Sequence, residues 1–358
     1  MNHEAELRGE CVLKLELGNE EKSFSSPSLT PNSYPLTPVQ FLFDALGIPL
    51  SAILLGLLTG LLTWRGTRRA FRDLNLSQGQ WANVTGLIGI VLGAAFVWSA
   101  LVWQSQSTPE VLPPEGWRQA RVLYHLSLIV LLLIITATDF KSFYILDWCC
   151  WVGVIIAVSG AVLSGHFQIA HVWVDWNAEI PQFAGPGMPA WLEHHPHLHG
   201  LAWSSAGAAC GFLSTAIVRW IAAILLRMPA LGFGDVLLMG MVGAYLGWQP
   251  TLVALLLAPL LAVGIGTAIK VLGNRPALPF GPFLAAGSLV VLFCWRWIWM
   301  AEFSFASNGS TDRATTFAVR RFFGDPVALL LIFGVSIVSL IVLLGLLQLY
   351  RRLPGKTN

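Results

Sequence analysis

Charge is what this 358-residue sequence has least of: Asp, Glu, Lys and Arg together make up 11% of it, against roughly 25% in a soluble globular protein. The 21 basic and 19 acidic side chains leave a formal net charge of only +2. This composition excludes an ordinary cytosolic enzyme, a disordered chain and a nucleic-acid binder held by a basic surface.

Cysteine is also scarce, and no Cys-x-x-Cys pair occurs among its five scattered residues: Cys11, Cys149, Cys150, Cys210 and Cys294. An odd number without paired spacing predicts neither a disulfide framework nor a zinc site built from thiolates. We therefore expect no cofactor and no metal held by cysteine.

Apolar residues, by contrast, make up 55% of the chain, and the 34 glycines and 16 tryptophans suit packed and anchored membrane helices. A helix needs about 20 mostly apolar residues to cross a bilayer. Nine runs approach this pattern: 43–64, 81–103, 122–138, 148–164, 201–226, 236–247, 251–272, 280–300 and 327–350. The sixth spans only ~18 Å as a helix, so it should be tilted or extended. We predict an all-α, polytopic membrane helix bundle of about eight to nine transmembrane helices.

Lys and Arg indicate the orientation, because short loops retained in the cytoplasm are rich in them. Every second junction carries such residues: Arg65, Arg68, Arg69 and Arg72, then Lys141, then Arg227, then Lys270 with Arg275, and finally Arg351, Arg352 and Lys356. With nine crossings, this pattern places the C-terminus in the cytoplasm and the polar segment 1–42 outside. We expect that segment to be mostly disordered.

Six histidines crowd the outward segment 165–199, which contains no Lys or Arg: His166, His171, His194, His195, His197 and His199. Their imidazoles suit a transition metal. The simpler interpretation is a solvated loop, because no acidic or thiolate partner is spaced with them and Pro196 disrupts helical geometry.

Two aspartates stand at the ends of apolar runs, where an ionisable group is costly and usually functional. Asp139 ends one run, in Thr-Ala-Thr-Asp-Phe-Lys, and Asp235 opens another, in Gly-Phe-Gly-Asp-Val-Leu. By the orientation above, both lie at the cytoplasmic edge of their helices and at the same depth. Either they face headgroup water separately, or they meet across the bundle.

A meeting of the two carboxyls would suit hydrolysis. Two carboxyls about 3 Å apart cannot both ionise, so they share one proton. The ionised one takes a proton from water, and the protonated one donates to the oxygen of a scissile carbonyl. Gly232 and Gly234 have no Cβ, so an extended peptide can approach Asp235 closely.

At these residues the sequence resembles a known family. The segment 232–235, Gly-Phe-Gly-Asp, is similar to the Gly-x-Gly-Asp signature of membrane aspartyl proteases. The segments 236–248 and 278–285, the latter with Pro-Phe-Gly-Pro, resemble the type IV prepilin leader peptidases. The stretch 139–147 resembles that family's first catalytic motif, in which a second acid follows the Asp by eight residues. The resemblance extends over 120–300.

The resemblance implies a membrane aspartyl endopeptidase, multi-pass in the bacterial cytoplasmic membrane and serving type IV pili or protein secretion. It would cut the basic leader from prepilin-like pilins or pseudopilins on the cytoplasmic side. Asp139 and Asp235 would be the catalytic pair. The supporting residues would be Gly232, Gly234, Asp147, Pro279 and Gly281. Its partners would be these membrane substrates and the lipid bilayer, with no nucleic acid.

The chain departs from the family at three places. Leu146 replaces the usual Pro before the second acid of the first motif, and Leu237 replaces the usual Lys after the second catalytic Asp. Longer members carry a cytoplasmic domain with paired Cys-x-x-Cys zinc motifs, linked to N-methylation, between their first two helices. The corresponding connection here, 65–80, is short and has no Cys. The resemblance is therefore to a short form without the zinc and methylation domain.

The predicted organisation has four parts. They are the polar tail 1–42; two N-terminal helices with a short basic cytoplasmic loop in 43–119; a peptidase core in 120–300 that contains the outer His-rich loop 165–199; and an outer loop, last helix and basic tail in 301–358.

Two other functions stay open. A weak peptidase-like protein would bind pilin-like helices without cutting, and a proton-coupled carrier would use the aspartates as a relay. Arg219, inside an apolar run, is expected to snorkel to the cytoplasmic interface.

Overall fold

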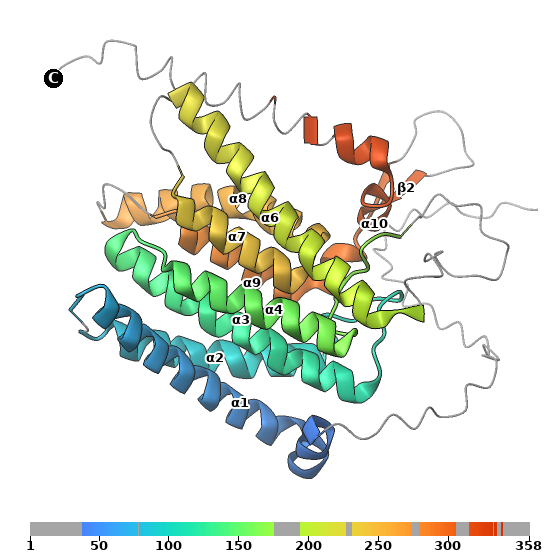
Figure 1. The fold of residues 1–358 in the computed structure, drawn as a ribbon, viewed down its shortest axis with the longest axis horizontal. Helices are drawn as coiled ribbons and strands as arrows, with labels where there is room; N and C mark the ends of the chain where they lie inside the picture. The colour runs from blue at the N-terminus through green and yellow to red at the C-terminus, as the bar shows by residue number, and fades with distance from the viewer. Residues whose placement is uncertain are drawn as a thin grey trace, which may run out of the picture. The chain divides into compact units, whose positions relative to one another are not determined.

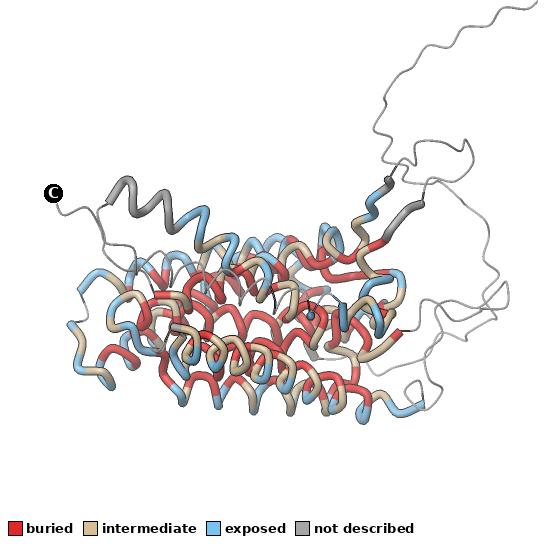
Figure 2. Tube along the Cα trace, turned by 90° about the horizontal axis from the view of Figure 1, so that it is seen from above, coloured by how far each residue is buried: buried red, intermediate tan, exposed pale blue. Residues whose placement is uncertain are grey.

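The structure is a computed structural model that describes residues 38–77, 79–174, 194–226, 231–273, 279–305, 315–331, 333–334 and 338. The chain divides into two units, Met1–Leu36 and Thr37–Asn358, and everything below concerns the second. Its helices pack side by side, with buried residues on their inner faces and exposed residues on their outer faces (Figures 1 and 2).

The predicted all-helical membrane bundle is confirmed. The main helices are α1 (Pro38–Asp73), α2 (Trp81–Leu101), α3 (Glu115–Ser142), α4 (Asp147–Ser164), α6 (Pro196–Leu226), α7 (Phe233–Leu246), α8 (Trp248–Gly273) and α9 (Gly281–Trp299). Within the described residues, seven of these are long and apolar enough to cross a bilayer, and α7 is a shorter apolar helix. The ninth predicted run, 327–350, lies largely outside the described residues.

The first helix is longer than its apolar run. It continues to Asp73, so the arginines expected in a loop at 65–72 lie on its last turns, and only residues 74–80 connect it to α2. Near its start a kink occurs at Gly47, which has a φ of 70°. Good helix formers such as Arg and Ala extend a helix into the polar interface, which a search for apolar runs does not detect.

The short helix α7 is sheathed by protein. It has 14 residues, about 21 Å at helical rise, and every residue from Asp235 to Leu246 is buried. Its neighbours include α4, α6, α8 and α9. A helix with no lipid-facing side need not match the thickness of the bilayer, because other helices rather than lipid cover its length from Asp235 onward.

Small residues bring α6 and α7 together. A Cβ added to Gly207 of α6 would collide with the backbone oxygen of Gly243 in α7, and a Cβ on Gly243 would collide with the oxygen of Gly207. Close backbone approach through glycine is a common way for membrane helices to associate. This contact fixes the position of the helix that begins beside Asp235.

The segment after α9, predicted only as an outer loop, contains a small hairpin. Strands β1 (Glu302–Phe305) and β2 (Thr315–Ala318) pair antiparallel, with Glu302 opposite Ala318, and α10 (Val319–Phe322) follows. Arg320 of α10 forms ion pairs with Glu110 and Glu302 at 3.7 and 3.4 Å. The hairpin is thereby tied to the segment that precedes α3.

Candidate active site

Helices α3 and α7 run antiparallel in a register that brings the two aspartates to one level. Near the C-terminal end of α7, the hydroxyls of Ser127 and Tyr245 are 2.7 Å apart, and the Tyr124 hydroxyl donates to the Ala244 carbonyl at 3.4 Å. From the Ser127–Tyr245 contact, Asp139 lies about 18 Å along α3 and Asp235 about 15 Å back along α7. The two carboxyls therefore stand at the same end of the bundle.

Asp139 lies in the last turn of α3 and is only 5% exposed. The helix ends there because Phe143 adopts a left-handed conformation, with a φ of 56°. The backbone N–H of Gly281, the first residue of α9, donates to the Asp139 carboxyl. A Cβ on Gly281 would collide with Oδ2 of Asp139. The start of α9 thus faces this carboxyl with the partial positive charge of a helix N-terminus.

Asp235 stands at the same end of the bundle, but at the start rather than the end of its helix, α7. It lies in the first turn of that helix, is 7% exposed, and its Oδ2 accepts the backbone N–H of Gly232 at 3.0 Å. Gly232 itself is exposed, as is Phe233 at 53%. The buried carboxyl is therefore only a few atoms from a surface that a substrate can reach.

The two carboxyls are close enough to interact electrostatically. Ile145, from the connection between α3 and α4, packs between the turns that hold them. A Cβ on Gly234 would lie 2.7 Å from the Ile145 Cβ, and one on Gly281 would lie 3.1 Å from its Cδ1. Two buried carboxyls that interact at one end of the bundle, one facing the start of α9 and one in the first turn of α7, can divide the roles of proton acceptor and proton donor toward a water molecule.

The remaining predicted supporting residues differ in their burial. Gly281 and Pro279 are buried, and Asp147 is exposed as the first residue of α4. The two residues that depart from the family pattern, Leu146 and Leu237, belong to the hydrophobic core. Because Asp147 is the first residue of α4, its negative charge stabilises the start of that helix.

Two residues at the site have roles that the sequence does not reveal. Ile145 lies within the motif that contains Asp139, but only the packing shows that it contacts both Gly234 and Gly281. Arg219 is half-buried on α6, and its guanidinium donates to the Leu231 carbonyl at 3.1 Å, beside the Asp235 turn.

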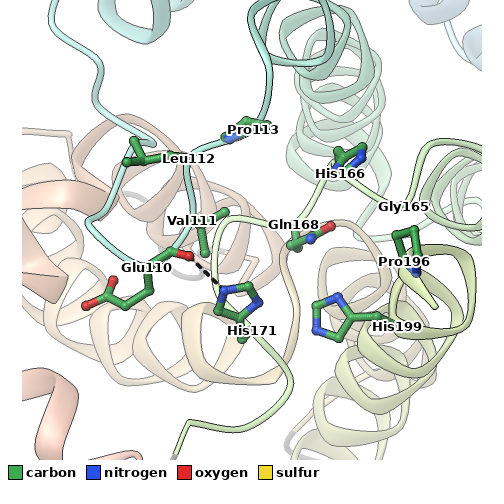
Figure 3. Close-up of a pocket in the computed structure, with 10 residues that line it drawn as sticks. All are labelled: Glu110, Val111, Leu112, Pro113, Gly165, His166, Gln168, His171, Pro196 and His199. Atoms are coloured by element: carbon green, nitrogen blue, oxygen red, sulfur yellow. Dashed lines mark hydrogen bonds between the residues drawn. The ribbon is translucent and has the colours of Figure 1, made fainter. Parts of the chain in front are cut away.

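A cavity of about 180 Å³ lies near the other end of α3, roughly 35 Å from Asp139 along the helix. Figure 3 shows His171 and His199 facing each other across it, with ring centroids 5.3 Å apart. Nε2 of His171 donates to the Glu110 carbonyl at 2.8 Å. Among the described residues, the His171 Nδ1 and the Gln168 Oε1 are buried without a hydrogen-bond partner. This polar cavity is separate from the paired carboxyls.

The histidines of 165–199 do not form a metal centre in the part of the chain that the structure describes, since no group of three or more ligand side chains converges there. His171 and His199 are buried, whereas His194, His195 and His197 are exposed. Residues 175–193 of the segment lie outside the described residues. The expected solvated loop is thus partly replaced by a buried histidine pair.

Comparison with known sequences supports the resemblance drawn from the motifs. Residues 186–267 match the type IV leader peptidase family, and this segment contains Gly232 and Asp235 but neither Asp139 nor Gly281. The predicted resemblance to prepilin peptidases is confirmed as a distant relationship over about a quarter of the chain. No solved structure matches the chain.

Individual relatives agree with this. A prepilin leader peptidase/N-methyltransferase of Burkholderia pseudomallei is 34% identical over 90 residues, 24% of this chain and 29% of that protein. A protein of the same description from Pseudomonas putida is 36% identical over 91 residues, 24% of this chain and 32% of its own. The type 4 prepilin-like proteins leader peptide-processing enzyme of Escherichia coli is 34% identical over 104 residues, 29% of this chain and 37% of its own. The chain therefore spans about a third of the length of these relatives.

Proposed function

We propose that this multi-pass membrane protein, a distant relative of the type IV leader peptidases, is an aspartyl endopeptidase that removes the leader from prepilin-like proteins. The observation that carries the proposal is a pair of buried carboxyls that interact electrostatically at one end of the bundle, Asp139 in the last turn of α3 and Asp235 in the first turn of α7. The family match adds independent support for the half of the site that contains Asp235.

The reaction requires little beyond this pair. With one carboxyl ionised and the other protonated, the ionised group accepts a proton from water as its oxygen attacks the scissile carbonyl carbon. The protonated carboxyl donates its proton to the carbonyl oxygen, which gives a tetrahedral diol. When the diol collapses, the C–N bond breaks and the leaving nitrogen takes a proton. The products are a carboxylic acid and an amine, and the carboxyl pair again holds one proton.

The substrate would approach along the exposed side of the Asp235 turn. Gly232 and Phe233 are exposed there, and Gly232 has no side chain to block an extended peptide. The positive-inside pattern supports a cytoplasmic location for this end, in a bacterial inner membrane, with the 1–42 tail outside. The substrates would be pilin or pseudopilin precursors, held by their own apolar helices within the bilayer.

The N-methyltransferase half of the relatives' descriptions is not part of the proposal. The sequence contains no Cys-x-x-Cys pair, and the connection 74–80 between α1 and α2 is too short for a further domain. The supporting roles proposed for Gly232, Gly234, Asp147, Pro279 and Gly281 are to shape the site, and the catalytic roles are confined to Asp139 and Asp235.

The direct test is cleavage of a co-expressed prepilin-like substrate by Asp139→Asn and Asp235→Asn. Because the chemistry needs both carboxyls, each variant should reduce the processing rate by at least about 100-fold. Asp73→Asn, which changes an exposed carboxyl at the end of α1, is the matched control and should process normally. Wild-type cleavage by either active-site variant would refute the proposal. Binding of the leader without product would instead indicate a non-cutting pilin-binding protein.

A further inference from the structure

Arg219 reaches the turn that precedes Asp235. Its guanidinium donates to the Leu231 carbonyl at 3.1 Å and lies 5.9 Å from the centre of the Phe233 ring. These two contacts lie on either side of Gly232, whose N–H binds Oδ2 of Asp235 at 3.0 Å. The side chain therefore does more than snorkel to the interface, because it is bound to the backbone next to the carboxyl.

The Arg219 charge also acts directly on Asp235. Among the residues that the structure describes, Asp235 interacts with the titratable or charged groups of Asp139 from α3, Cys150 from α4 and Arg219 from α6. Arg219 is the cation in this set, and a nearby positive charge stabilises the ionised form of a carboxyl. In the described part of the chain, the charged group that acts on Asp139 is Asp235 itself, which disfavours a second negative charge.

We propose that Arg219 is a positioning residue that holds the 231–235 turn in place and makes Asp235 the ionised member of the carboxyl pair, with Asp139 as the protonated member. Both carboxyls accept one backbone N–H, from Gly232 and Gly281 respectively, so these bonds alone do not distinguish them. The two carboxyls differ in that the Arg219 guanidinium is bound beside Asp235. The catalytic meaning of this role rests on the proposed peptidase function.

The assignment gives each proton a definite path. The Asp235 carboxylate accepts a proton from water, and the Asp139 carboxyl donates its proton to the carbonyl oxygen of the substrate. When the diol collapses, Asp235 gives its proton to the leaving nitrogen, and Asp139 recovers a proton from the diol hydroxyl. One water is consumed, one C–N bond is broken, and both groups return to their initial states.

The first test compares the pH dependence of kcat/KM for Arg219→Gln, Arg219→Lys and the wild type. Loss of the charge in Arg219→Gln should shift the acidic limb to higher pH and lower kcat/KM near pH 6 by at least about tenfold. Arg219→Lys keeps the charge but loses the planar donor fork, so it should retain most of the wild-type limb with a lower kcat. Arg72→Gln, which removes an exposed arginine from the end of α1, is the matched control and should leave the profile unchanged.

A second test does not depend on cleavage. Hydrophobic carbodiimides modify protonated carboxyls, so mass spectrometry of the labelled protein at pH 7 reports which aspartate carries the proton. Asp139 should be labelled in preference to Asp235 in the wild type, and Arg219→Gln should raise labelling of Asp235 several-fold. Equal labelling in the wild type, or a ratio that Arg219→Gln leaves unchanged, would overturn the role of Arg219. An Arg219-dependent ratio in a protein that cleaves no prepilin would retain that role while refuting the proposed function.

Discussion

Gly281 leaves no room for a side chain between the start of α9 and the Asp139 carboxyl. A methyl group at this position would collide with Oδ2 of Asp139 and lie 3.1 Å from Cδ1 of Ile145. Gly281→Ala should therefore displace the carboxyl and lower kcat/KM on the order of 100-fold, the loss that a misplacement of about 1 Å can cause. Cleavage of a leader peptide by the purified protein measures this.

The control for this prediction is Gly264→Ala in α8, where an added Cβ meets nothing within 4 Å. Its kcat/KM should equal that of the wild type. If Gly281→Ala were as active as Gly264→Ala, Gly281 would have no part in placing Asp139. The unfolding temperatures of both variants should be compared, so that loss of the fold is not mistaken for loss of the site.

For individual residues, the sequence points to the two carboxyls and to glycines that contact them, but not to the contacts of Arg219 and Ile145. Asp139 and Asp235 are visible because a carboxyl at the end of an apolar run is costly. The roles of Arg219 and Ile145 are not visible, since an arginine inside an apolar run is expected to snorkel and an isoleucine in a motif is an ordinary residue. Their roles depend on contacts that form only in the folded chain, between Arg219 and the Leu231 carbonyl in the next connection and between Ile145 and the start of α9 at Gly281.

Helix α7 both carries a site residue and packs closely against a neighbouring helix. It carries Asp235 at its first turn and is held against α6 by Gly243 and Gly207. Gly243→Ala would normally favour a helix by up to about 1 kcal/mol. Here the new methyl group collides with the Gly207 backbone, which cannot move like a flexible side chain. We expect a lower unfolding temperature in detergent and reduced cleavage, because α7 moves with Asp235.

The matched variant on the same helix is Gly240→Ala. It is also buried, but its added Cβ would lie 3.5 Å from the nearest atom, in Phe212, an ordinary contact distance. This variant should unfold at the wild-type temperature or above. Equal behaviour of the Gly243 and Gly240 variants would show that the close approach of α6 and α7 does not hold the helix.

The lengths of the apolar runs predict the membrane helices, but this prediction fails in two ways. Apolar runs locate the membrane helices, but they miss polar extensions such as the end of α1 through Arg72. They also miss the hairpin of β1 and β2, because four-residue strands between turns have too little pattern to distinguish from a loop. The short run that becomes α7 is detected, but its burial on all sides follows only from the neighbours that cover it.

The whole molecule has different chemistry at its two ends. One end holds the paired carboxyls, and the other holds a polar layer in which Arg121, 2% exposed, donates to the carbonyls of Gln106 and Gln168. In the same layer, the Trp299 indole donates to the Glu110 carboxylate. Hydrogen bonds that satisfy buried polar groups between separate segments hold those segments in one arrangement. This layer joins the start of α3 to the segments before α3 and after α4 and to the end of α9.

His171 makes the stability of that layer depend on pH. Burial lowers the pKa of the His171 imidazole, and Glu110 opposes this only partly. In the unfolded chain a histidine titrates at about pH 6.5. Because the pKa of His171 is lower in the folded protein, the unfolded state binds more protons than the folded state below that pH. The contribution of His171 to stability is therefore complete above this pH and decreases as the pH falls.

The unfolding temperature of the detergent-solubilised protein should be lower at pH 5.5 than at pH 7.5. In His171→Gln, whose amide can still donate to the Glu110 carbonyl, the difference should shrink, whereas the exposed His195→Gln should keep it. An unchanged difference in His171→Gln would mean that other groups cause the pH dependence.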